Sequence, residues 1–439
     1  MPQVSLSGLA LVAVVAFAIP LLLGALPSLR LPGAVLEIVA GIVLGPSVLG
    51  WVRVDVPLGV LSVIGLAFLL FLAGLEIDVQ QLRGGLLRLV LLAFVASFAV
   101  ALAVGGALAA AGLVTSPLLL AIILTSTSLG VVVPVLADAG LTAADFGQLV
   151  IAAASIADFG AIVLLSLFFS REATSTAAQL TLLGCLLAVT VVAAAGLLRA
   201  GRSMRLAAEL VKLQDTSAQI RVRGAVALLV VFTWFAQRLG LEVILGAFLA
   251  GVIVKIADRD VAETHPEFPV KLQALGYGFF IPFFFVVSGV RFDLAALTSD
   301  AGALARVPLF LLALVLARGL PALLYRSRIG PRRTLVAALL QATSLPFIVA
   351  AAQIGMELGQ LDQATGAALV AAGLLTVLLF PLAAVSVLRG APASGPGTPR
   401  APAAPSPGPG AAAPAGSRPS AQGSRTPRPH SSPRRRADG

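Results

Sequence analysis

Runs of about 20 apolar residues follow one another along most of this 439-residue chain. A helix of about 20 residues crosses the hydrocarbon core of a bilayer, because each residue adds about 1.5 Å to its length. Only 11% of the residues are charged, against about 25% in soluble domains. The chain is therefore predicted to be an all-α polytopic membrane protein with about 13 transmembrane helices. The runs cover roughly residues 5–27, 33–51, 57–76, 84–112, 116–137, 146–170, 177–199, 221–238, 241–256, 272–289, 305–325, 333–355 and 364–388.

Basic residues are shared unevenly between the loops that separate these helices. If the N-terminus lies outside, the cytoplasmic loops carry most of the arginines and lysines, with the largest cluster between Arg199 and Arg221. Such an excess marks the cytoplasmic side of a membrane protein. No arginine or lysine precedes Arg30, so the first run lacks the basic flank of a cleavable signal peptide. We expect a multi-pass protein of the cell (inner) membrane with its N-terminus outside and its C-terminus in the cytoplasm.

Residues 391–439 differ in composition from everything before them. They are rich in Pro, Gly, Ala and Ser, and they hold seven arginines but a single acidic residue, Asp438. A segment with so little apolar surface to bury is predicted to be disordered. We therefore expect one transmembrane domain over 1–390, followed by a cytoplasmic tail. The tail accounts for much of the formal charge of +10, so this charge does not predict a nucleic-acid partner, and a passive tail is favoured over one that binds anionic lipid.

Three sequence segments recur in the same order in the two halves of the chain. Their partners fall on predicted helices 2 and 9, 3 and 10, and 5 and 12. Because the members of each pair are seven helices apart, which is an odd spacing, the two copies have opposite orientations in the membrane. Such an inverted repeat, over about 5–170 and 221–389, is typical of secondary transporters that work by alternating access. The pairs are LEIVAGIVLG (36–45) with LEVILGAFLA (241–250), FLAGLEIDVQQL (71–82) with VVSGVRFDLAAL (286–297), and LTSTSL (124–129) with LQATSL (340–345).

The third pair places polar residues and a proline inside two apolar helices. Proline removes a backbone donor and clashes with the preceding turn, so Pro134 and Pro346 predict two helices with unwound middles. Irregular backbone at this depth is tolerated only where it faces protein or water, and it marks the binding site in many transporters. The polar residues concerned are Ser126, Thr127 and Ser128 in the first copy and Gln341, Thr343 and Ser344 in the second.

A single acidic residue, Asp158, lies within the apolar run AASIADFGAIVLLSLFF (153–169). A carboxylate near the bilayer centre costs about 2.5–3.5 kcal/mol on insertion scales and is more often functional than structural. Ser155 lies three residues earlier, on the same helix face. Carboxylate and hydroxyl oxygens suit a small monovalent cation, and low dielectric disfavours an empty charged carboxylate. A site of this kind, holding either a cation or a proton, is sufficient for exchange.

A second charge, Arg318, is also predicted to lie deep in the membrane. It stands twelve residues from Arg306 and eight from Arg326, which is about 12 Å of helix from the nearer one. It is predicted to balance the charge of Asp158 or to support the two broken helices; the alternative is that its side chain snorkels to the membrane surface.

Six motifs resemble the monovalent cation:proton antiporter-2 family, which includes Kef-type and NapA-type exchangers. The resemblance covers about residues 5–389 and implies an NhaA-like fold with a dimerisation domain, a moving core domain and two crossed discontinuous helices. It implies that Asp158 is the ion-binding carboxylate, that Arg318 is the basic residue on the helix before the second broken helix, and that the protein is a homodimer. The motifs are GIVLGPSVLG (41–50), LLFLAGLEID (69–78), TSTSLG (125–130), SIADFGAIVL (155–164), PFFFVVSGVRFDL (282–294) and QATSLPF (341–347).

One position departs from the pattern of this family. Where relatives usually carry Asp, Asn or Gln before the essential aspartate, this chain has Ala157. A single carboxylate suggests one cation for one proton, which is electroneutral exchange. The missing ligand leaves open whether the cation is Na⁺ or K⁺.

Other classes of protein fit the sequence less well. A sodium-coupled symporter of an organic solute uses a similar inverted repeat and remains the alternative. An intramembrane aspartyl protease needs two facing acids, whereas only Asp158 lies deep in a span. A serine protease of the membrane needs a histidine base, whereas His265 and His430 lie outside the apolar runs, and the single cysteine, Cys185, excludes a thiol metal cluster. We therefore expect a transporter that is not an enzyme and needs no cofactor.

Overall fold

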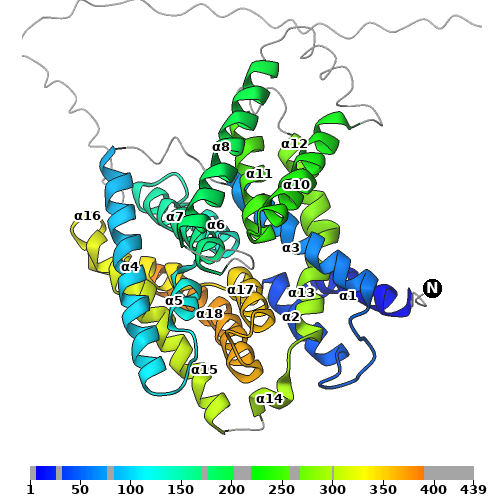
Figure 1. Cartoon of the computed structure of the whole chain (residues 1–439). Helices are drawn as coiled ribbons and strands as arrows, with labels where there is room; N and C mark the ends of the chain where they lie inside the picture. The colour runs from blue at the N-terminus through cyan, green and yellow to red at the C-terminus, as the bar shows by residue number, and fades with distance from the viewer. Residues whose placement is uncertain are drawn as a thin grey trace, which may run out of the picture. The chain divides into compact units, whose positions relative to one another are not determined.

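A computed structural model describes residues 6–25, 32–76, 84–169, 176–201, 219–257, 267–298 and 301–389. These residues belong to one compact unit, Met1–Ala391, and every element of regular structure among them is a helix (Figure 1). The predicted disordered tail lies outside them, as do several of the basic loop residues used to predict orientation, among them Arg202, Arg205 and Lys212.

The helices follow one another in the order that the apolar runs predict. They are α1 (Leu6–Ala25), α2 (Gly33–Leu44), α3 (Val56–Glu76), α4 (Gly84–Ala110), α5 (Pro117–Thr125), α6 (Leu129–Asp138), α7 (Asp145–Phe168), α8 (Thr176–Gly201), α10 (Ile220–Arg238), α11 (Val243–Ala257), α12 (Glu267–Leu275), η1 (Gly276–Phe280), α13 (Ile281–Val290), α14 (Leu294–Thr298), α15 (Ala301–Leu314), η2 (Val315–Gly319), η3 (Pro321–Tyr325), α16 (Arg326–Gln341), α17 (Pro346–Glu357) and α18 (Gln363–Arg389).

The predicted number of spans is confirmed within the described residues. Nine helices are long and apolar enough to cross a membrane, and three shorter apolar helices accompany them. The longest of the nine, Ala301–Gln341, is interrupted at Gly330, where φ is 77° and the backbone leaves the helical conformation. Glycine adopts this left-handed region without strain, so the segment forms two spans. The chain is thus a multi-pass membrane protein with thirteen apolar segments in its described part.

Two spans contain a π-helical turn that the sequence pattern does not predict. In the first, η1 (Gly276–Phe280) ends two residues before Pro282, and in the second, η2 (Val315–Gly319) ends two residues before Pro321. A proline ring clashes with the carbonyl group four residues earlier, and a π turn widens the helix at that point. The second of these turns carries Arg318.

The inverted repeat is visible in how the helices pack. Helix α3 packs along α11, and its repeat partner α13 packs along α2. Both contacts rely on a glycine at the same position of the repeat. A side chain at Gly74 would overlap the carbonyl oxygen of Phe248, and one at Gly289 would overlap that of Ile38. Glycine is required at both positions because the two backbones are in direct contact, and the predicted inverted-repeat architecture is confirmed.

The helices associate in two sets that packing distinguishes. We call α1–α3 and α10–α13 the glycine-packed group, because it contains the two glycine contacts. We call α4–α7 and α15–α18 the broken-helix group; its members pack on one another, with α5 beside α17 (Figure 1). Helix α8 contacts α11 of the first group and α7 of the second.

Candidate ion site at two crossed helix breaks

Two helices are interrupted at membrane depth, and the interruptions cross. The first lies between α5 and α6, the second between α16 and α17. The Ser128 backbone N–H donates to the carbonyl oxygen of Thr343 at 2.8 Å, and the hydroxyl groups of Ser126 and Ser344 are 2.6 Å apart. The prediction of two crossed discontinuous helices is confirmed.

The two breaks have different local causes. Pro346 begins α17 in the second copy, as its missing N–H favours at the start of a helix. In the first copy, Pro134 lies inside α6, so it does not cause the break. The hydroxyl groups of Thr125 and Ser126 instead donate to carbonyl oxygens three residues earlier, where they compete with the helical hydrogen bonds. Proline therefore accounts for the second break, as predicted, but not for the first, where the prediction is wrong about the cause.

The carboxylate of Asp158 faces the first break. The backbone N–H of Thr127 donates to its Oδ1 at 3.1 Å, directly before the N-terminus of α6. The N-terminus of a helix carries about half a positive charge, which stabilises the carboxylate. Asp158 itself is half-buried, so its side chain is partly open to a ligand.

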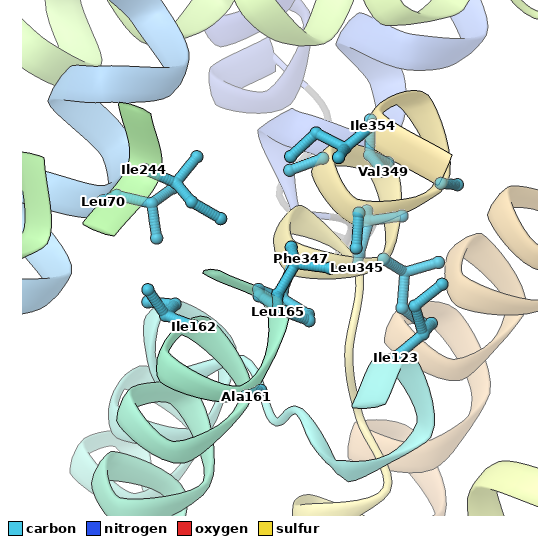
Figure 2. Packing of buried hydrophobic residues seen from close by; sticks show 14 of the residues in the cluster. Leu70, Ile123, Ala161, Ile162, Leu165, Ile244, Leu345, Phe347, Val349 and Ile354 are labelled. Carbon is cyan, nitrogen blue, oxygen red and sulfur yellow. The ribbon is translucent and has the colours of Figure 1, made fainter. Parts of the chain in front are cut away.

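A cavity of about 70 Å³ reaches Asp158. A space of this kind needs about 10–15 Å³ to hold one water molecule, so several waters or a partly hydrated ion fit. Figure 2 shows three apolar side chains from its wall, Leu70, Ile162 and Phe347. Its polar lining consists of Asp158, Thr127, Ser128 and Glu76.

The side chain of Arg318 supports both breaks. It is 2% exposed, so it does not snorkel. Its Nε donates to Oγ1 of Thr127 at 3.0 Å and to the carbonyl oxygen of Gln341 at 3.4 Å, and its Nη1 donates to Oγ of Ser97 at 3.3 Å. Gln341 ends α16, so the cation also lies at the negative end of a helix dipole. Arg318 and Asp158 therefore both contact Thr127, the cation at its hydroxyl and the anion at its N–H.

The predicted polar residues lie in three places. Thr127 and Ser128 line the cavity beside Asp158. The others make bonds elsewhere: Ser155 donates to the Ile151 carbonyl of its own helix at 2.9 Å. The remaining members lie in the crossing itself, namely Ser126, Gln341, Thr343 and Ser344. The Thr127 hydroxyl links the cavity to the crossing by donating to the Gln341 carbonyl at 2.7 Å.

Two residues of this region were missed by the sequence reasoning. Thr376 of α18 holds the second break, because its hydroxyl accepts from the Ser344 N–H at 3.2 Å and contacts the Ser344 carbonyl at 3.0 Å. Glu76 ends α3 and lines the cavity of Asp158. The sequence feature that could have identified Glu76 is the repeat, which pairs it with Arg291. Ala157 is fully buried by its neighbours.

The fold and this site define a class of protein, the inverted-repeat secondary transporters with crossed discontinuous helices. The chain belongs to the sodium/hydrogen exchanger transmembrane family, whose model matches residues 12–390, and the resemblance inferred from the motifs is confirmed at this level. The chain is 32% identical to the Bacillus subtilis protein YjbQ over 87% of its own length and 63% of that of YjbQ. It therefore spans less than two thirds of that relative.

Two further similarities concern Methanocaldococcus jannaschii. A protein named "Probable Na(+)/H(+) antiporter 3" is 28% identical over 81% of this chain and 90% of its own. The solved structure of the sodium proton antiporter MjNhaP1 superposes with a TM-score of 0.61 over 87% of this chain and 98% of its own, at 17% identity. At that identity the second similarity shows a shared fold.

Proposed function

We propose that this protein is a secondary active antiporter that exchanges a monovalent cation, Na⁺ or K⁺, for H⁺ by alternating access. The observation that carries the proposal is a half-buried carboxylate, Asp158, which accepts the Thr127 N–H at a helix break and opens on a cavity. Family membership and the name of the M. jannaschii relative favour exchange over the alternative, symport of an organic solute.

The chemistry follows from competition for one carboxylate. In a site with little water, an unpaired carboxylate is costly, so Asp158 binds either a proton or a cation. The neighbouring oxygen atoms of Thr127 and Ser128 line the same cavity and would replace part of the hydration shell of the cation. Because Asp158 cannot carry both ligands at once, one cation crosses for each proton that returns, and the exchange is electroneutral.

Arg318 has a positioning role in this mechanism. It fixes the Thr127 hydroxyl and the Gln341 carbonyl, and so it fixes the N–H that Asp158 accepts. Its guanidinium also offsets the negative charge of Asp158 when neither ligand is bound. Ala157 supplies no second carboxylate, which supports a stoichiometry of one to one.

The wider organisation is part of the same proposal. Residues 1–390 form the exchanger domain, with inverted repeats at about 5–170 and 221–389, and residues 391–439, which lie outside the described residues, form a cytoplasmic tail. The protein lies in the cell (inner) membrane as a homodimer, with its N-terminus outside. The broken-helix group is the part that moves, because it contains the ion site, and the glycine-packed group is the part that stays fixed.

The test uses purified protein in liposomes that contain a pH-sensitive dye. Addition of Na⁺, K⁺ or Li⁺ without any organic solute should move protons in the wild type, and the order of the three responses gives the selectivity. Asp158→Asn should abolish the response. Asp145→Asn is the matched control, because Asp145 lies in the first turn of the same helix. An active Asp158→Asn variant would overturn the proposed site, and a response that requires an organic solute would favour the symporter.

A further inference from the structure

A second, smaller cavity lies between the two helix groups, at the end of α13. Its volume is about 20 Å³, against about 70 Å³ for the cavity of Asp158. Ser288 and Arg291 line it from the glycine-packed group, and Gln353 and Ala367 line it from α17 and α18 of the broken-helix group.

The inverted repeat relates this cavity to the one that reaches Asp158. The pairing of 71–82 with 286–297 sets Ser288 against Ala73 and Arg291 against Glu76. Ala73 and Glu76 line the cavity of Asp158, so the second cavity uses equivalent positions of the other repeat. Since the repeats have opposite orientations, we assign the two cavities to opposite sides of the membrane, the one at Asp158 being the larger.

A hydrogen bond between the two groups crosses the smaller cavity. The Nε2 of Gln353 donates to Oγ of Ser288 at 3.0 Å. The Ser288 hydroxyl donates its own proton to the Phe284 carbonyl of the same helix at 2.7 Å. A hydroxyl group has one proton and two lone pairs, so Ser288 is held as an acceptor and the Gln353 amide is the donor. Ser288 is buried, which protects the bond from competition by water.

The larger cavity has no equivalent of this bond. Ser288 corresponds to Ala73 in the repeat. Counted from the break segments LTSTSL (124–129) and LQATSL (340–345), Gln353 corresponds to Ala137. Two alanine side chains offer no donor or acceptor. The chain therefore carries a polar link across one passage and only methyl groups at the matching positions of the other.

We propose that the smaller cavity is the second passage for the cation and that the Ser288–Gln353 hydrogen bond is the latch that closes it. The latch favours the conformation in which Asp158 faces the larger cavity, and it must break when the broken-helix group moves. This inference rests on the proposed alternating access, but it concerns the balance between two conformations rather than the chemistry at Asp158.

The experiment measures how fast a membrane-impermeant maleimide labels a single cysteine in each passage. The native thiol is removed by Cys185→Ala, and reporters are introduced one at a time. Ala367→Cys reports on the second passage, and Gly130→Cys reports on the first, where a new side chain meets no atom within 4 Å. Ser288→Ala and Gln353→Met remove the hydrogen bond while they retain most of the side-chain volume.

Each latch variant should raise labelling at Ala367→Cys about fivefold, the population shift expected for one neutral hydrogen bond, and should lower labelling at Gly130→Cys. The double variant should change the rates no more than the larger single one, because both substitutions remove the same bond. Unchanged rates would overturn the latch, and so would a rise at both reporters, which indicates local loosening. A single elution peak for each variant verifies folding. The assay needs no ion gradient, so it is readable even if exchange at Asp158 is disproved.

Discussion

The two helix breaks are built on the same plan and differ in the side chain that holds each one. At the first break, the carboxylate of Asp158 accepts the N–H of Thr127. At the second break, the hydroxyl of Thr376 accepts the N–H of Ser344. Each side chain comes from the helix that follows the broken one along the chain, α7 for Asp158 and α18 for Thr376.

This difference separates structure from chemistry. Either acceptor satisfies a backbone N–H that would otherwise be unpaired within the membrane, where each such group costs several kcal/mol. Only the carboxylate can in addition exchange a proton for a cation. The inverted repeat thus supplies a helix break twice, while a carboxylate accepts the backbone N–H at only one of the two breaks. In the proposed exchange, this carboxylate holds one ligand at a time.

The largest expected effect comes from making the two breaks alike. Asp158→Thr replaces the carboxylate by the group found at the second break, so the Thr127 N–H retains an acceptor while the charge is lost. Cation-driven proton movement in liposomes should fall to the level of protein-free liposomes, with little loss of thermal stability. If the protein unfolds instead, the carboxylate is needed for the fold, and the distinction drawn between the two breaks is wrong.

The next effect concerns the residue that joins the breaks. Arg318→Met removes a buried cation that donates to Thr127, Gln341 and Ser97, and hydrogen bonds of charged groups contribute about 1.5–3 kcal/mol each. Unfolding in denaturant should show a loss of about 2–4 kcal/mol, less than the sum of the three bonds, because desolvation of the buried guanidinium offsets part of their contribution. Arg306→Met is the control and should lose less, because Arg306 donates one hydrogen bond, to Oγ1 of Thr365 at 2.9 Å, and its partly exposed contact with Asp362 at 3.7 Å is worth about 1 kcal/mol or less. Equal losses would contradict the role given to Arg318.

Much of this arrangement could be predicted from the sequence. The spans depend on the length of apolar runs, and the crossed breaks depend on LTSTSL and LQATSL, which are visible as a repeat. Asp158 and Arg318 stood out because charge is costly at that depth. Each of these features can be recognised in one segment or by comparing two segments.

The remaining features depend on packing between segments. The bond between Thr376 and Ser344 joins residues 32 positions apart, and it requires the angle between α17 and α18, which no local pattern specifies. Glu76 ends α3, and only the position of that helix against the first break brings the residue into the cavity. Ser155 was placed on the right helix, but the hydrogen bond to its own backbone could not be distinguished from an ion-facing hydroxyl.

A smaller effect is expected at the second break itself. Thr376→Val keeps the shape of the side chain and leaves the buried Ser344 N–H without its acceptor, which costs about 1–3 kcal/mol. The free energy of unfolding should fall by that amount, while the cation concentration for half-maximal exchange stays within about twofold, because Asp158 is untouched. Thr298→Val is the control, since that hydroxyl is exposed and bonds only its own helix. A large change in cation affinity would mean that the second break also contacts the ion.

The smallest effect distinguishes the mouths of the two cavities. Glu76 lines the larger cavity, whereas its repeat partner Arg291 lines the smaller one together with Asp293. The charged residues of the larger cavity are therefore acidic, and those of the smaller one are a basic and an acidic residue. Charges that line a cleft raise the local concentration of counter-ions. Glu76→Gln should therefore raise the half-maximal cation concentration about threefold at low salt, less at high salt, when cation is supplied to the side of the larger cavity. Arg291→Gln should leave that value unchanged or lower it when cation is supplied to the other side. Liposomes with protein in one orientation allow both measurements, and the same response in the two variants would show that the charges at the mouths do not govern access.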